Sequence, residues 1–230
     1  MTTIRAIVKN VAIIGAGSLV LIWWDKRKSA VPNRVRTLAH EAVALQQDNV
    51  VDGDGGSSAR KKWKEALALS HANSLSPKVL FNLSFALACN LDESGEKELA
   101  EQEFKRALQA FPLEYDVHSL EENTRNRVGV TLDRLAQREQ DRGRFAEAMV
   151  LYDRALDALA TPEEVATLNA EFLTRSTHVE TIAGILSNVA TLYVQLGREE
   201  SAKQVLDKSD LLMNSLKMSS LNLAPTDESS

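Results

Sequence analysis

The chain has 230 residues, 26% of them charged and 44% hydrophobic, with five prolines and ten glycines, which is typical of a globular helical protein. Residues 1–28 hold five of the 27 basic residues and one of the 32 acidic ones, which leaves 22 basic against 31 acidic residues and a net charge of −9 in the remainder. An acidic body argues against nucleic acid as a partner, because phosphate binding needs clustered Lys and Arg.

The chain begins with a candidate membrane anchor. Residues 11–24 (VAIIGAGSLVLIWW) are uncharged and mostly apolar, and Asp25 with three basic residues follows as a charged stop. Counted back to Ala6, the run reaches about 19 residues, close to the roughly 20 that a helix needs to cross hydrocarbon. No small-residue cleavage site precedes the stop, so we expect an uncleaved signal-anchor over 1–28 rather than a cleaved or amphipathic targeting segment or a buried helix. The anchor residues are Ile13, Leu19, Leu21, Trp23 and Trp24.

Two features of this segment indicate how it would sit in a membrane. Small residues such as Gly15 and Gly17 would allow a second membrane helix to pack against it, in addition to lipid. The positive charge is heavier on the C-terminal flank, which favours a body on the cytosolic side. The segment resembles the N-terminus of the small presequence receptors of the mitochondrial outer-membrane translocase, through WWDKRKSAVP. That resemblance implies a mitochondrial membrane, the outer one facing the cytosol being preferred over the inner one facing the intermembrane space.

The sequence after residue 28 predicts helices joined by short turns. The apolar periodicity and the capping residues predict four pairs, 33–48 with 58–72, 76–92 with 96–110, 120–141 with 144–159, and 163–196 with 198–213. Ser76-Pro77 marks a helix start, and Gly143 and Gly197 fit the left-handed position that ends a helix. The Gly/Asp-rich residues 50–58 are expected to form a loop. The helical domain therefore covers 29–213, and the Ser-rich residues 214–230 are expected to be a disordered tail.

The second helix of every pair carries a small residue, a large one four positions later, and a small one three further on. One helix face therefore alternates small and large side chains, so that a neighbouring helix can approach closely. The four sets are Ala59/Trp63/Ala66, Ala100/Phe104/Ala107, Ala148/Tyr152/Ala155 and Ala202/Leu206/Ser209. Such self-similarity predicts an all-α solenoid of about four stacked helix pairs behind one N-terminal membrane helix.

The pattern resembles the tetratricopeptide repeat. The third and fourth pairs carry the repeat's core positions at Leu135, Ala136, Gly143, Phe145, Ala148, Tyr152 and Ala155, and at Val189, Ala190, Tyr193, Gly197 and Ala202. Pro112 stands where the repeat-closing proline falls. The key alanines lie further apart than the family period of about 34 residues. This spacing predicts longer helices or insertions at 112–127 and 160–180.

No motif for catalysis or for binding a metal or cofactor is present. The histidines at positions 40, 71, 118 and 178 are scattered without ligand spacing, and no nucleophile elbow or phosphate-binding loop occurs. A solenoid of this kind presents a concave surface rather than a cleft. We therefore expect no enzyme, no metal and no cofactor.

The remaining chemistry is recognition. The resemblance implies a concave groove lined by the first helix of each pair, which would bind a protein or peptide. Its expected contacts are Asn82, Phe85, Cys89, Asp133, Gln137, Gln140, Ser187, Thr191 and Val194. Only Arg134 agrees with the basic clamp of chaperone-binding members, so we expect an amphipathic or basic helix lying on Phe85 near Asp133.

Two functions follow from these expectations. One is an anchored adaptor or receptor that binds client polypeptides at a mitochondrial membrane, in protein import or quality control. The other is a structural subunit or assembly factor of a mitochondrial membrane complex, including an adaptor for an inner-membrane AAA protease.

Overall fold

The computed structural model describes residues 33–52, 55–111, 116–167 and 178–222, and every regular element in them is a helix. The all-α prediction is confirmed for these residues. None of their helices is long and apolar enough to cross a membrane. The predicted anchor and its five named residues lie outside the described part. The chain divides into two compact units, one ending at Asp116 and the other beginning at Val117.

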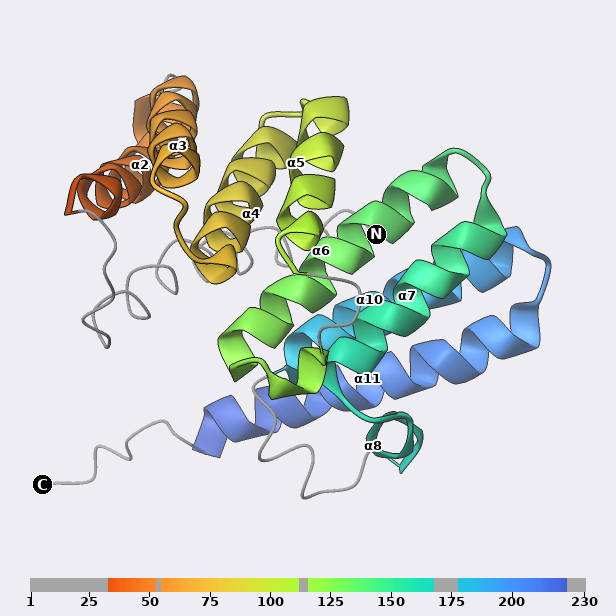
Figure 1. Cartoon of the computed structure of the whole chain (residues 1–230). Coiled ribbons are helices and arrows are strands. Elements are labelled where there is room, and N and C mark those ends of the chain that lie inside the picture. Colours follow the sequence, from red (N-terminus) through yellow and green to blue (C-terminus); the bar gives the residue numbers. More distant parts are fainter. Residues whose placement is uncertain (1–32, 53–54, 112–115, 168–177, 223–230) are drawn as a thin grey trace, which may run out of the picture. The chain divides into compact units, whose positions relative to one another are not determined.

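The first unit contains two helical hairpins. Helix α2 packs against α3, α4 packs against α5, and α3 also packs against α4, so the two hairpins stack (Figure 1). Helix α4 starts with proline in its first turn, directly after Ser76, as predicted. The bounds are α2 Asn33–Asp52, α3 Gly55–Ala72, α4 Pro77–Glu93 and α5 Lys97–Gln109.

The second unit contains the other two hairpins. Helix α6 packs against α7 and α10 against α11, while α10 also contacts both helices of the preceding hairpin. Consecutive hairpins therefore stack within each unit, as a repeat array requires. The bounds are η1 Val117–Ser119, α6 Glu122–Asp141, α7 Phe145–Leu159, α8 Pro162–Thr167, α10 Val179–Gln195 and α11 Glu199–Asn222.

Glycine ends the first helix of three hairpins. Gly95, Gly143 and Gly197 have φ values of +79°, +73° and +68°, the left-handed region that glycine adopts without steric cost. The amide of Gly143 donates to the Gln140 carbonyl and that of Gly197 to the Val194 carbonyl. Both predicted turns are confirmed.

The alternation of small and large residues builds the core of the first three hairpins. Their alanines are 0% exposed, and Trp63, Phe104 and Tyr152 are at most 1% exposed. In α11 the prediction fails at Leu206, which is 44% exposed, although Ala202 and Ser209 are buried. Helix α11 belongs to the last hairpin, and no fifth hairpin among the described residues covers its outer face. Leu212 is buried in the core instead of Leu206.

Three predicted boundaries are wrong. The loop expected at 50–58 is shorter, because α2 continues to Asp52 and α3 begins at Gly55. The single helix expected at 163–196 is divided into α8 and α10, and residues 168–177 lie outside the described part. Residues 214–222 continue α11 instead of forming a tail, because no proline or glycine interrupts the helix there.

Candidate peptide-binding surface

The first helices of the two hairpins in the second unit, α6 and α10, are joined by three side-chain hydrogen bonds. Thr181 Oγ1 donates to Asn126 Oδ1 at 2.8 Å, Asn188 Nδ2 donates to Asp133 Oδ1 at 2.8 Å, and Gln140 Nε2 donates to Gln195 Oε1 at 2.8 Å. We call these six residues the polar ladder.

The ladder has a regular register. Each pair is separated by 55 residues in sequence, and successive pairs are seven residues apart on both helices. Residues seven apart share one helix face, so each helix turns one polar row toward the other. Since the pairs occur in the same order along both helices, α6 and α10 run parallel. A one-turn slip of α10 would break all three hydrogen bonds at once.

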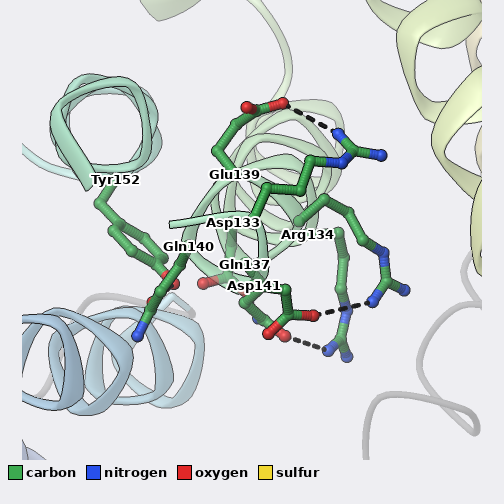
Figure 2. Close-up of polar contacts among 9 residues, drawn as sticks. Asp133, Arg134, Gln137, Glu139, Gln140, Asp141 and Tyr152 are labelled. Carbon is green, nitrogen blue, oxygen red and sulfur yellow. Dashed lines mark hydrogen bonds and ion pairs between the residues drawn. The ribbon is translucent and has the colours of Figure 1, made fainter. Parts of the chain in front are cut away.

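Asp133 occupies the middle of the ladder and is 9% exposed. Besides the bond from Asn188, it accepts a hydrogen bond at Oδ2 from Gln137 Nε2 at 2.6 Å. Gln137 in turn accepts from Arg134 Nη1 at 3.4 Å (Figure 2). Two side-chain amides therefore hydrogen-bond to a largely buried carboxyl group, as the burial of a polar group requires.

Gln140 connects three helices. Its Oε1 accepts a hydrogen bond from the Tyr152 hydroxyl of α7 at 2.7 Å, while its Nε2 donates to Gln195 of α10 at 2.8 Å. In Figure 2 the Tyr152 ring extends from α7 toward Gln140. Burial, and secondarily the charge of Asp133, raises the pKa of the Tyr152 hydroxyl above its ordinary range. Tyr152 therefore remains a neutral donor, and the amide of Gln140 has one orientation.

The C-terminal end of α6 contains paired charges. Glu139 forms ion pairs with Arg142, at 3.2 Å, and with Arg144, while Arg138 lies 3.8 Å from Asp141. Arg142 and Arg144 flank the turn at Gly143, so these pairs hold the turn against α6. Three of these five residues are basic and two are acidic, so the cluster carries a net charge of +1.

Exposed hydroxyl groups border the ladder on α10. Ser187 and Thr191 are both exposed, and they lie on either side of Asn188 in sequence. Thr191 Oγ1 donates its proton to the Ser187 carbonyl at 3.0 Å, so its lone pairs can accept a hydrogen bond from outside. Together with the half-buried Gln137 and Gln140, the structure brings these four predicted contacts onto or beside the α6–α10 seam, where a polypeptide could reach them.

The contacts predicted on α4 have a different environment, and the prediction of an exposed Phe85 is wrong. Phe85 is 3% exposed, and its ring lies 6.2 Å from that of Phe81 and 6.3 Å from that of Phe104. Asn82 is 2% exposed and Cys89 is half-buried. The reason is that α4 is mostly apolar and is packed against both α3 and α5.

The sequence reasoning missed Asn126, Thr181, Asn188 and Gln195. A signal for them is present, since polar residues recur every seven positions on both helices. On α10 the predicted Val194 is 60% exposed. Within the described residues no group of three or more His, Cys, Asp or Glu side chains could hold a metal ion.

Comparison with known proteins identifies one repeat. Residues 183–212, which span most of α10 and half of α11, match the tetratricopeptide repeat model. No curated protein matches the chain. Among solved structures, the crystal structure of BtubC (BKLC) from P. vanneervenii is similar over 88% of this chain and 97% of that one, with 14% identity and a TM-score of 0.41. A similarity of that strength carries no argument about function. The repeat match, together with the stacked hairpins, supports a tetratricopeptide-repeat protein, a class that generally binds protein partners.

Proposed function

We propose that the protein is an adaptor that binds a segment of a client polypeptide across α6 and α10, and that it acts by binding rather than by catalysis. The observation that carries the proposal is the polar ladder, bordered by the exposed Ser187 and Thr191. The ladder groups hydrogen-bond to one another across the seam, and the two hydroxyl residues beside it are exposed to a partner. The tetratricopeptide match at residues 183–212 includes most of α10 and supports the same reading.

The adaptor is held at a mitochondrial membrane by residues 1–28. The apolar run over 11–24, its two tryptophans and the basic stop support this part of the proposal, as does the resemblance to small presequence receptors. The outer membrane with the body in the cytosol is the preferred placement, because the C-terminal flank carries more positive charge. Client binding next to a membrane suits import or quality control.

Site-specific photo-crosslinking in intact cells tests the proposal. A photo-reactive residue at Ser187 should form adducts with other polypeptides, whereas one at Asp157, an exposed residue of α7, should not. Deletion of residues 1–28 should release the protein from carbonate-washed membranes and change the crosslinked polypeptides. Equal adducts at both positions would refute the binding surface, and full-length protein in the carbonate supernatant would refute the anchor.

A second candidate is a structural subunit or assembly factor of a membrane complex. It is favoured by α11, on which Leu206 and Leu211 are 44% and 50% exposed. A permanent partner would cover such side chains. Native electrophoresis separates the two functions. A structural subunit should migrate in one stable complex that survives a high-salt wash, whereas an adaptor should dissociate from its clients.

A further inference from the structure

We infer that the exposed basic face of α3 docks on the anionic headgroups of the membrane in which the protein is anchored. The inference rests on the proposed anchor over residues 1–28, and it adds a contact between the helical body and the lipid surface. The face consists of five residues, which we call the α3 face: Ser57, Lys61, Lys64, Ala68 and His71.

The α3 face lies opposite the side of α3 that packs in the core. Its five residues are all exposed and follow one another at intervals of four, three, four and three, so they share one side of the helix. The buried side carries Ala59, Trp63 and Ala66, which are at most 1% exposed. The lysines of the α3 face therefore stand on a surface that no described helix of the first unit covers.

The two lysines of the α3 face have no ion pair among the described residues. Neighbouring basic side chains of the same hairpin are each paired with a carboxylate, Arg34 with Glu65 at 3.0 Å and Lys62 with Glu41 at 2.6 Å. Helix α3 carries four Lys or Arg residues and one acidic residue, although the chain as a whole has a net charge of −5. Lys61 and Lys64 therefore form a positive surface on an acidic protein, and its partner should be anionic.

The α3 face lies close to the proposed anchor. Helix α2 begins at Asn33, five residues after Lys28, the last residue of the basic stop. Five residues of extended chain reach at most about 18 Å, so the anchor would hold the start of α2 within this distance of the membrane surface. Helices α2 and α3 pack side by side, and the Arg34–Glu65 ion pair places the start of α2 beside the second half of α3 (Figure 1). Lys64 adjoins Glu65, so it lies at the end of the hairpin that is nearest to the anchor.

This tether favours the membrane over a free acidic partner. A lysine near an anionic leaflet strengthens binding by about fivefold, so two lysines give roughly 25-fold, which is too little to hold a macromolecule that must associate from free solution. The anchor removes that cost, because it keeps the lipid surface at a high local concentration. The attraction decays within about 8 Å at physiological salt, so the α3 face must lie on the headgroups.

The test places a fluorophore on the α3 face of the full-length protein in lipid nanodiscs. Ala68→Cys in a Cys89→Ser background gives one labelling site on this face. The nanodiscs contain phosphatidylcholine alone or with phosphatidylserine, and in both some lipids carry a headgroup nitroxide, which quenches the fluorophore only at short range. Lys61→Glu and Lys64→Glu are each compared with Lys97→Glu, a matched control at an exposed lysine of α5 that also has no ion pair among the described residues. Circular dichroism verifies that every variant is folded.

We expect quenching to be strong with phosphatidylserine, weak with phosphatidylcholine alone, and reversed by high salt. Lys61→Glu and Lys64→Glu should each lower the ratio of docked to undocked protein, measured from the quenched fraction, by about fivefold or more. Lys97→Glu should leave this ratio unchanged.

Failure of the inference and failure of the anchor give different results. Protein that enters the nanodiscs but shows no additional quenching with phosphatidylserine would overturn the docked face and keep the anchor. Quenching that Lys64→Glu and Lys97→Glu change alike would do the same. Protein that remains outside the nanodiscs in gel filtration would overturn the anchor and the docked face together. Crosslinking at Ser187 tests client binding independently of both.

Discussion

Replacing Gly129 of α6 by alanine should destabilise the second unit, although alanine is the better helix former. A Cβ at position 129 would lie 2.8 Å from Leu159 Cγ and 2.9 Å from both of its Cδ atoms. Leu159 is 3% exposed, so its side chain has little space in which to move. Overpacking of this kind costs about 1–3 kcal/mol. The higher helix propensity of alanine offsets about 1 kcal/mol of this cost, so the net loss of unfolding free energy is up to about 2 kcal/mol.

Gly184 of α10 provides the matched control, because a Cβ there would meet nothing within 4 Å. Gly184→Ala should therefore stabilise the protein by up to about 1 kcal/mol. A third comparison introduces Gly129→Ala in a Leu159→Ala background, where the obstructing atoms are gone and the substitution should become stabilising.

Thermal unfolding of the full-length protein in detergent, followed by circular dichroism at 222 nm, reads out all three effects. For a chain of this size, 1 kcal/mol corresponds to a shift of about 2–4 °C in Tm. Gly129→Ala should lower Tm and Gly184→Ala should raise it. The close packing of α6 on α7 is refuted if the two substitutions shift Tm in the same direction and Leu159→Ala does not reverse the effect of Gly129→Ala.

Three further tests, with four substitutions in all, examine the core and the ladder. Phe85→Ala should lower the free energy of unfolding by about 3–5 kcal/mol, and Tm with it, because Phe85 packs between Phe81 and Phe104. An unchanged Tm would show that Phe85 is not a core residue and would make it a candidate peptide contact again. Gln140→Leu should lower the free energy of unfolding by about 1–3 kcal/mol, because it leaves the Tyr152 hydroxyl without its acceptor. Thr191→Val, at an exposed position, should change Tm little. Equal effects of the two substitutions on Tm would contradict the ladder. Because burial raises the pKa of Tyr152 above its unfolded value of about 10, the stability it contributes is complete below pH 10 and is lost as the pH rises further. Tyr152→Phe should flatten the fall in Tm above pH 10, and a phenolate signal at 295 nm from Tyr152 in the folded protein would contradict its burial.

The hairpins could be predicted from the sequence because residues that are close together in the chain determine where each helix begins, ends and buries a face. Glycine in the left-handed region ends α6 and α10, and proline in the first turn begins α4. The small and large residues on α3, α5 and α7 are buried as their spacing requires, since residues three and four apart share one helix face. These features need only near neighbours in the sequence.

The contacts between hairpins could not be predicted in the same way. Whether Phe85 faces the core or solvent depends on how α3 and α5 cover α4, and α4 has no polar stripe to orient it. The ladder requires α6 and α10 to meet in one register over a separation of 55 residues, with ten intervening residues outside the described part. The seven-residue spacing of its polar residues is visible in the sequence, but the pairing between helices is a property of the packed structure.

The first helices of the two units differ in how far their buried contacts are polar. In the first unit, α4 buries Asn82 and Phe85 among apolar neighbours, and its aromatic rings pack with those of α5. In the second unit, the corresponding first helices meet through amides, a carboxylate and hydroxyls. A polar seam contributes less to stability than an apolar one of equal area, because each hydrogen bond replaces one made with water. Such a seam is reasonable where the register of the two helices matters more than stability, because a slip of one turn would break all three hydrogen bonds.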